Sequence, residues 1–308
     1  MSSLIEKIRH HRALSAFLIF LLLFMVFFFV SGFSEILLPP LYEKWIGSLD
    51  EGVHEYYYDT IVELILVIAL VLAFCLAHRS SPAAMGLVNL KEGVMPFLRG
   101  LFYGAGGVTL ITGVLFLKGD VSFSTFSLKP GVFAMLVFFA GVALSEETLT
   151  RGVLQHTFVR KGYVKLGLIL PSLLFGALHL GNPSATWLSI FNTMLIGLIL
   201  ALGVYLGKNL YSAIGFHLTW NFFLSIVYGL PVSGFDFSKY SMMQAQLKQS
   251  DIWNGGEYGI EGGLLTTILF FIVLGVQAFL LTQGKRVKSS LPAEEFAESD
   301  AKSNQMGG

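Results

Sequence analysis

The sequence predicts an all-α, polytopic membrane protein with about eight transmembrane helices in one bundle around a buried polar cavity. Of the 308 residues, 54% are hydrophobic and 13% are charged, about half the ~25% charged share of soluble domains. The apolar residues form long blocks, and ionisable residues interrupt three of them. The 20 Lys and Arg balance the 20 Asp and Glu, so no basic excess indicates nucleic acid as a partner.

A helix needs about 20 apolar residues to cross a hydrocarbon core of ~30 Å. Eight stretches come close to this length, and we predict them as spans: 14–33, 60–77, 96–117, 131–158, 164–180, 186–206, 210–230 and 263–282. The first follows a basic segment, as a signal peptide does. Its apolar core is longer than the ~7 to 15 residues of the apolar core of a signal peptide, and no A-x-A cleavage site follows. We therefore expect a retained span.

The distribution of basic residues predicts the orientation. With the N-terminus inside, all Lys and Arg lie on the inner side except Lys44, Lys118, Lys129, Lys239 and Lys248. Positive flanks stay cytoplasmic, so we expect a multi-pass protein of the cell membrane, with both termini cytoplasmic. The absence of organelle signals favours a bacterial membrane. We divide the chain into a cytoplasmic segment (1–13), a transmembrane domain (14–283) and a disordered cytoplasmic tail (284–308).

Three spans carry polar clusters where each ionisable side chain costs at least ~2.5 to 3.5 kcal/mol to insert. The clusters are Glu146, Glu147 and Arg151 in the fourth span, Phe175 and His179 in the fifth, and His217 and Asn221 in the seventh. Counted from the flanking basic residues at 1.5 Å per residue, Glu146 and His179 lie about 21 Å deep, Asn221 about 20 Å and His217 roughly 13 Å. The spacing therefore predicts one polar layer near mid-membrane.

Helical spacing predicts which of these side chains face one another. Glu147 precedes Arg151 by four residues, the favourable order for an ion pair within one helix. Adjacent residues point about 100° apart, so Glu146 is left to face a different neighbour. His217 and Asn221 are also four apart and share one face of their helix.

Phe175 lies one turn before His179 and can support its imidazole ring. Together the three clusters supply a carboxylate, two imidazoles and a carboxamide to a cavity of low dielectric constant. These groups can hold and deprotonate a water molecule. The residues therefore favour a hydrolase.

The three clusters resemble the motifs of the CPBP intramembrane proteases, also called the Abi or type II CAAX prenyl protease group. The motif EExxxR is matched by Glu146, Glu147 and Arg151, FxxxH by Phe175 and His179, and HxxxN by His217 and Asn221. Each motif alone is a weak signal, and the three in this order on separate spans are a strong one. The resemblance covers about residues 85–230, which we expect to form the protease core.

This resemblance implies a membrane-embedded endopeptidase that hydrolyses a peptide bond in a peptide or a membrane-anchored protein. It implies a general base at Glu146, a structural or substrate-orienting pair at Glu147 and Arg151, a water-orienting group at His179, and oxyanion stabilisation by His217 and Asn221. The expected partners are therefore a peptide or membrane-protein substrate and the lipid bilayer.

Two cofactor states remain open. Glu146, His179 and His217 would also make a His₂Glu zinc site with an open fourth position, and the family is often labelled as metalloproteases. The sequence has no HExxH helix, and the amide of Asn221 is a poor zinc ligand but a good oxyanion donor. We therefore expect a mechanism that requires no cofactor, with zinc as the alternative.

Two other functions would use the same polar core. A proton-coupled transporter would use the carboxylates and imidazoles as a relay, although no inverted repeat is visible. A non-enzymatic bacteriocin-immunity or scaffolding protein would keep the fold without cleaving. Each cluster alone also has a structural interpretation, as a buried ion pair or as a histidine that bridges helices. The joint presence of the three motifs favours the peptidase.

Overall fold

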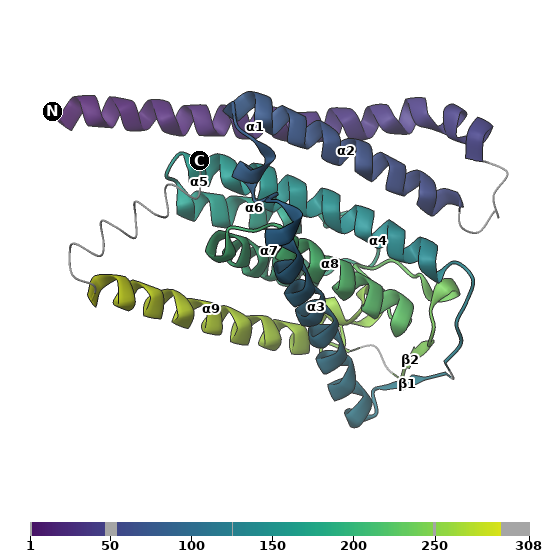
Figure 1. Cartoon of the computed structure of the whole chain (residues 1–308). Coiled ribbons are helices and arrows are strands. Elements are labelled where there is room, and N and C mark those ends of the chain that lie inside the picture. Colours follow the sequence, from purple (N-terminus) through teal and green to yellow (C-terminus); the bar gives the residue numbers. More distant parts are fainter. Residues whose placement is uncertain (1, 47–53, 125, 249–250, 291–308) are drawn as a thin grey trace.

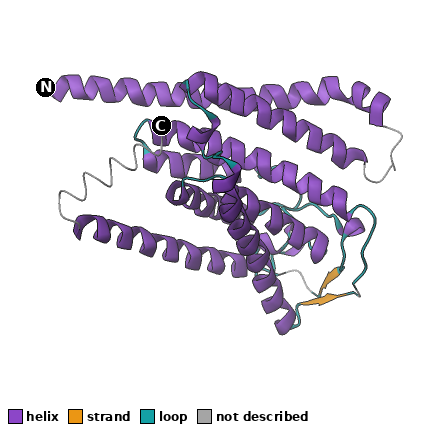
Figure 2. Cartoon of the chain, in the orientation of Figure 1, coloured by secondary structure: helices purple, strands orange, loops and turns teal. Residues whose placement is uncertain are grey.

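The computed structural model describes residues 2–46, 54–124, 126–248 and 251–290, and these are almost entirely helical (Figures 1 and 2). The α-helices are α1 (Ser2–Ile46), α2 (His54–His78), α3 (Leu90–Lys118), α4 (Val132–Glu147), α5 (His156–Arg160), α6 (Val164–Leu178), α7 (Trp187–Gly207), α8 (Tyr211–Phe222) and α9 (Leu264–Ser290). The predicted all-α membrane class is confirmed.

Shorter elements join these helices. Two π-helical segments, η2 (Thr148–Gln155) and η3 (Phe223–Val227), continue α4 and α8. Single 3₁₀ turns are η1 (Pro82–Met85), η4 (Ser238–Tyr240), η5 (Gly256–Tyr258) and η6 (Ile260–Gly262). The short strands β1 (Val121–Phe123) and β2 (Ala245–Leu247) pair antiparallel, with Ser122 opposite Gln246. The ribbon in Figure 1 shows this small sheet at the edge of the bundle.

The number of spans differs from the prediction. Within the described residues, six helical segments are long and apolar enough to cross a membrane: His11–Pro39, Tyr56–His78, Pro82–Lys118, Val132–Arg160, Trp187–Gly207 and Leu264–Gln283. The predicted spans 164–180 and 210–230 are wrong as full spans. The first contains α6, which has 15 residues, about 22 Å at 1.5 Å per residue. The second contains α8, which has 12 residues before η3.

Both short helices lie among other helices, so protein and not lipid surrounds much of their length. α6 packs on α7, and α8 packs on α3 and α4. An irregular backbone at membrane depth is tolerated where protein covers it. The apolar stretches that predicted two full spans therefore include turns and π-helix beside the polar motifs.

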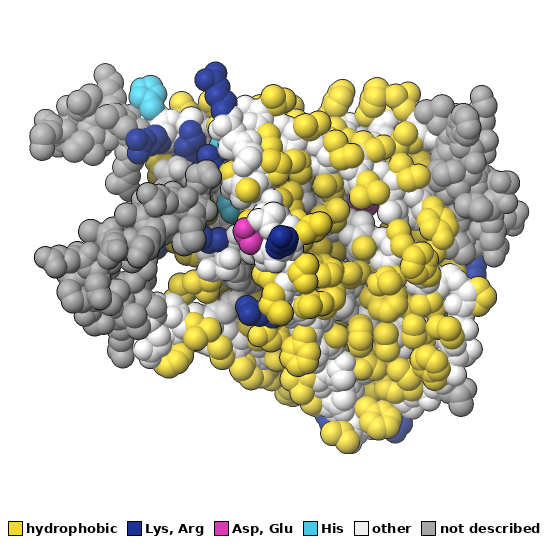
Figure 3. All heavy atoms as spheres, viewed as in Figure 1, with side chains coloured by type: hydrophobic (Ala, Val, Ile, Leu, Met, Phe, Trp, Pro, Cys, Tyr) yellow, Lys and Arg dark blue, Asp and Glu magenta, His cyan; other side chains and the backbone are white. Residues whose placement is uncertain are grey.

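The outer helices present apolar side chains outward. Phe29 of α1, Leu76 of α2 and Phe279 of α9 are 73%, 79% and 61% exposed. Figure 3 shows hydrophobic side chains over most of the visible face, with several Lys and Arg toward the left and a few at the lower and right edges. Such a surface suits contact with acyl chains, and its charged edges suit the aqueous boundary.

Two apolar cores meet at the first motif. One joins buried residues of α3, α4, α7, α8 and α9, and the other joins those of α1, α2, η2 and α5. The continuous segment from α4 through η2 to α5 contributes to both, with Phe139 in the first core and Val153 in the second. Glu146 and Glu147 lie between these two positions, so their backbone is held from both sides.

Glycines set the position of α8 against α3. A Cβ atom at Gly100 would collide with the carbonyl oxygen of Ser212, and one at Gly104 with that of Phe216. Two small residues four apart let helix backbones approach closely. This contact fixes the helix that carries the third motif.

The segment between α8 and α9 folds back over the bundle and is fastened to α7. The Asn192 amide nitrogen donates to the backbone oxygens of Glu261 (2.7 Å) and Gly263 (3.0 Å), and its oxygen accepts from Thr267 (2.7 Å). At the C-terminus, α9 continues to Ser290, beyond the predicted boundary at 283. The remainder of the predicted tail, 291–308, lies outside the described residues.

Candidate active site

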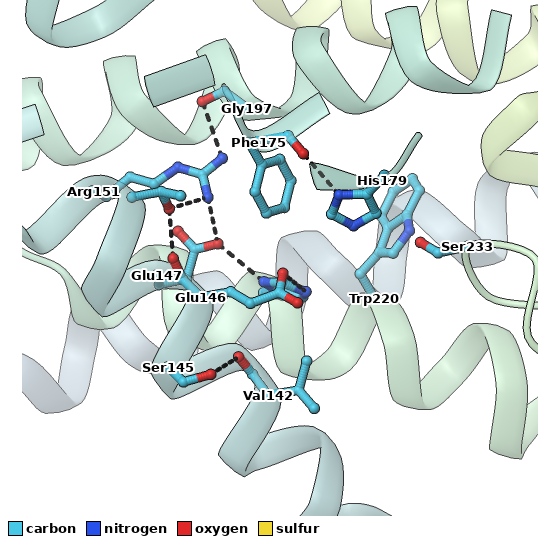
Figure 4. A network of polar contacts seen from close by, with 12 residues as sticks. Val142, Ser145, Glu146, Glu147, Arg151, Phe175, His179, Gly197, Trp220 and Ser233 are labelled. Atoms are coloured by element: carbon cyan, nitrogen blue, oxygen red, sulfur yellow. Dashed lines mark hydrogen bonds and ion pairs between the residues drawn. The ribbon is translucent and has the colours of Figure 1, made fainter. Parts of the chain in front are cut away.

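The structure brings all seven motif residues into one region, and Figure 4 shows Glu146, Glu147, Arg151, Phe175 and His179 close together. Three elements supply them: Glu146 and Glu147 end α4 and Arg151 follows in η2, Phe175 lies in the last turn of α6 with His179 just after it, and His217 and Asn221 lie on α8. Segments separated by some 70 residues in sequence thus meet, with a contact between Glu147 and His217. The predicted convergence of the three motifs agrees with this geometry.

Glu147 is at the centre of a buried network. Its Oε1 accepts from Arg151 Nη1 at 2.9 Å and lies 3.0 Å from His217 Nδ1. The side chains of Glu147 and Arg151 are 0% and 1% exposed. The predicted ion pair is therefore present, and it has a third member, His217, that the pairing rule within one helix did not include.

Arg151 makes three further contacts, with Thr150, Gly197 and Phe175. Nη1 also donates to Thr150 Oγ1 at 2.7 Å, and Nη2 donates to the Gly197 carbonyl of α7 at 3.2 Å. The guanidinium carbon lies 4.4 Å from the centre of the Phe175 ring, within the range of a cation–π contact. Arg151 therefore links the first motif to α6 and α7.

The chain changes from α-helix to π-helix directly after the two glutamates and again directly after Phe222, next to Asn221. A π-helix widens the turn by one residue, and such segments are frequent at functional sites. The predicted depth of Glu146, counted from Arg160, assumed an unbroken α-helix. Because a π-helix rises less per residue, η2 makes this depth smaller than predicted. Five of the seven motif residues nevertheless line the same cavity.

Glu146 has a different environment from its neighbour. Its side chain is 35% exposed, and its Oε2 lies 3.8 Å from His217 Nε2. That Oε2 atom is shielded and makes no hydrogen bond within the described part of the chain. Glu146 is thus the acidic residue of the first motif that faces open space.

Hydrogen bonds orient both imidazole rings. Nδ1 of His179 lies 2.7 Å from the Phe175 carbonyl oxygen, which only accepts, so Nδ1 carries the proton and donates. The Phe175 ring also lies beside the His179 ring, with centroids 4.8 Å apart. Nδ1 of His217 donates to Glu147 in the same way. Each histidine therefore keeps its Nε2 atom for other partners.

Two cavities meet at the motif residues. The larger has a volume of about 360 Å³, and Glu146, His179, His217 and Asn221 all line it. The smaller has a volume of about 40 Å³, and His179, His217 and Asn221 line it as well, without Glu146. The two histidines and the asparagine thus separate one chamber from the other.

The smaller cavity contains a carboxylate that sequence analysis missed. Glu261 Oε1 accepts from Trp220 Nε1 at 2.8 Å, and its Oε2 accepts from the Ser233 amide at 2.5 Å and the Ser233 hydroxyl at 3.2 Å. Burial raises the pKa of Glu261, and these donors and nearby His179 act against that rise. Glu261 belongs to a loop rich in acidic residues, and no motif or helical spacing distinguishes it from the others.

The zinc alternative requires three ligands around one point. Glu146, His179 and His217 all line the larger cavity, but no group of three or more His, Cys, Asp or Glu side chains in the described residues is arranged to hold a metal ion. The residues therefore do not fit a zinc site in this arrangement, and we derive no step through a metal.

Comparison with known families supports the motif assignment. Residues 128–223 match the family model described as type II CAAX prenyl endopeptidase Rce1-like. This segment contains the three motifs, from Glu146 to Asn221. Comparison with curated proteins and with solved structures gives no match. The segment that builds the site is therefore similar to the Rce1-like type II CAAX prenyl endopeptidases, in agreement with the CPBP group that the motifs resemble.

Proposed function

We propose that this protein is an intramembrane endopeptidase that activates water with Glu146 and hydrolyses a peptide bond in a peptide or a membrane-anchored protein. One observation carries the proposal: Glu146, His179, His217 and Asn221, from three separate helical segments, line a single cavity of about 360 Å³. The Rce1-like match supports a membrane protease as the general class.

The first step is the activation of water. Glu146 faces the cavity and has a carboxylate oxygen without a hydrogen bond, so it can accept a proton from a water molecule there. His179 can accept the second hydrogen of that water at Nε2, because its Nδ1 is committed to the Phe175 carbonyl. A positioned general base is typically worth about 10² to 10⁴ in rate.

The second step is attack on the substrate carbonyl. The water oxygen bonds to the carbonyl carbon as Glu146 takes its proton, and the carbonyl oxygen becomes an oxyanion. The carbon–nitrogen bond then breaks, its electron pair goes to nitrogen, and the proton on Glu146 moves to that nitrogen. The products are a carboxylic acid and an amine, and Glu146 is a carboxylate again.

His217 and Asn221 would stabilise the oxyanion. The Asn221 amide is a neutral donor next to the imidazole, since the two residues lie one turn apart on α8. Glu147 holds Nδ1–H of His217 and favours a charged ring, whose Nε2–H then points to the cavity. A donor of this kind is worth about 10² to 10³ in kcat. Glu147 and Arg151 therefore act by positioning His217.

The larger cavity also supports an apolar substrate. Besides the polar motif residues, its wall includes the aromatic side chains Phe27, Phe138, Phe139, Phe235 and Phe237. Pockets of this kind bind hydrophobic groups and fix them with a few polar contacts. We therefore infer that a C-terminal CAAX-type peptide with a prenylated cysteine is the first substrate to test.

Glu146→Gln tests the proposal. The variant keeps the size of the side chain but removes the base, so we expect cleavage of a farnesylated CAAX-type peptide to fall by about 10² to 10⁴ with an unchanged melting temperature. Glu257→Gln is the matched control, because Glu257 is an acidic residue outside both cavities that accepts from Ser184. Full activity of Glu146→Gln would contradict the proposal.

Because the substrate is an inference, the same pair of variants should be compared in cells. Mass spectrometry of peptides and membrane proteins should show cleavage products with the wild type and with Glu257→Gln. The products should be absent with Glu146→Gln. Proton-driven flux into proteoliposomes, without any cleavage, would instead support a transporter.

A further inference from the structure

The smaller cavity has a mostly apolar wall, to which Ile196, Leu200 and Phe216 contribute, and a polar patch on one side. Its wall away from the motif residues includes Glu261, Ser233, Asn192 and Thr193. Figure 4 shows Trp220 and Ser233 beside His179, on the side away from Arg151. A compartment with a polar patch thus adjoins His179, His217 and Asn221, which also line the larger, aromatic chamber.

The volume of this compartment suits water. A water molecule needs roughly 10 to 15 Å³ of space for its centre, together with several polar partners. The cavity offers about 40 Å³ for water centres, which is room for about three water molecules.

The polar groups around the compartment can accept further hydrogen bonds. A carboxylate can accept about four hydrogen bonds, and three donors reach Glu261. The Thr193 hydroxyl donates to the Ser189 carbonyl at 2.9 Å, so its oxygen can still accept. These groups can hold water in the smaller cavity.

A buried hydroxyl beside the compartment supports the same conclusion. Tyr258 is 1% exposed, and its hydroxyl makes no hydrogen bond within the described residues. Burial raises its pKa to about 12 against the opposing effect of the nearby polar side chains of Thr193, Ser233 and Asn182, so the hydroxyl keeps its proton. Buried hydroxyls usually have a partner, and a water between Tyr258 and Thr193 would supply one.

We propose that the smaller cavity is a water compartment that resupplies the catalytic site, and that Glu261 is the positioning residue that orders its contents. The inference rests on the proposed hydrolysis, because each cleavage consumes one water. The aromatic chamber is filled by the substrate during the reaction. Water stored beside His179 and Asn221 can replace the molecule that is consumed without crossing the substrate.

Thr193→Val tests the compartment with little change in shape. The variant removes the hydroxyl and keeps the branched side chain, so we expect kcat to fall about fivefold, the value of one hydrogen bond, with KM unchanged. Thr193→Ser should restore kcat. Thr60→Val is the matched control, because Thr60 is also a buried helical threonine that donates to a carbonyl four residues earlier, at 2.7 Å, and it lines neither cavity.

Glu261→Gln should lower kcat more, because the amide nitrogen of glutamine would face a donor at Trp220 or Ser233. This variant also risks misfolding, so its kcat is interpreted only beside an unchanged melting temperature. An unchanged kcat in both a folded Glu261→Gln and Thr193→Val would overturn the proposal.

An experimental structure separates this inference from the proposed function. At a resolution that shows ordered water, the wild type should contain water bonded to Glu261 and Thr193, and Thr193→Val should lose part of it. A dry compartment would overturn the inference even if Glu146→Gln abolishes cleavage. Water in the compartment of a protein that cleaves nothing would instead overturn the proposed hydrolysis.

Discussion

Two adjacent glutamates at the end of α4 lie in contrasting environments. Glu147 is fully buried, and one of its oxygens contacts both Arg151 and His217. Glu146 is 35% exposed to the larger cavity, and its nearest charged partner is 3.8 Å away. Identical side chains one residue apart thus differ in what holds them: protein groups hold Glu147, and open space adjoins Glu146.

This difference teaches how one motif can supply both structure and chemistry. A buried carboxylate is stable when charged partners and hydrogen bonds compensate for its lost hydration. Oε2 of Glu147 has no hydrogen bond within the described residues, but Glu147 lines neither cavity and so offers this oxygen to no substrate. A carboxylate that faces a cavity can offer its oxygens to a substrate. Because His217 contacts Glu147 through Nδ1 and approaches Glu146 through Nε2, this ring connects the two environments.

The largest expected effect comes from removing one charge of the buried Glu147–Arg151 ion pair. Glu147→Gln leaves the Arg151 guanidinium buried without its counter-charge, so we expect the free energy of unfolding to fall by about 3 to 5 kcal/mol. Arg151→Met should destabilise less, because Glu147 loses Arg151 but keeps its contact with His217. The measurement is thermal or denaturant unfolding in detergent.

The double variant Glu147→Gln, Arg151→Met is the control for this prediction. It removes both charges, so it should recover part of the stability that each single variant loses. Strictly additive losses would show that the ion pair is not what stabilises this side of the site.

Sequence analysis predicted the pairing within the first motif correctly for a physical reason. Residues four apart on a helix face one another, so Glu147 and Arg151 were matched and Glu146 was left for the cavity. Spacing within one helix carries no information about partners on other helices. For this reason the contact of Glu147 with His217 of α8 did not follow from it.

The two errors in the predicted architecture have one origin. Hydropathy reports that a stretch is apolar, and both lipid and a protein interior accept such a stretch. Hydropathy therefore predicted full spans at 164–180 and 210–230, where the structure has the shorter helices α6 and α8. Glu261 was missed because its acidic loop reads as solvent-exposed in the sequence. In the structure, hydrogen bonds from Asn192 and Trp220 hold Glu261 in the interior.

The second largest effect concerns the open side of the comparison. Asn221 lines both cavities, so Asn221→Ala should lower kcat by about 10² to 10³ through loss of an oxyanion donor, with little change in the melting temperature. Asn192→Ala is the matched amide. Its three hydrogen bonds hold the loop before α9, so it should lower stability by about 1 to 3 kcal/mol. Equal effects of the two variants on stability would remove the distinction between them.

A smaller effect is expected from shifting α8, which carries the ring that joins the two environments. Gly104→Ala places a methyl group against the Phe216 carbonyl, and such overpacking typically costs about 1 to 3 kcal/mol. Activity should fall in parallel, because His217 and Asn221 move together. Gly106→Ala is the control, since no atom lies within 4 Å of its added Cβ, and it should be neutral or stabilising. Similar losses in both variants would contradict the role of the α3–α8 contact.

The smallest expected effect comes from removing metal ions, which tests whether Glu146 acts as a base or as a metal ligand. We expect activity to be unchanged after exhaustive chelation of the purified protein, and metal analysis to find no stoichiometric zinc. The reason lies in the arrangement of the side chains: no group of three His, Cys, Asp or Glu ligands in the described residues is arranged for a metal ion. Zinc would also lower the pKa of its bound water to about 7, and Glu146 would then be one ligand among three. Activity that disappears on chelation and returns with zinc would show that Glu146 binds a metal, and the contrast with Glu147 would then be between a metal ligand and a structural charge.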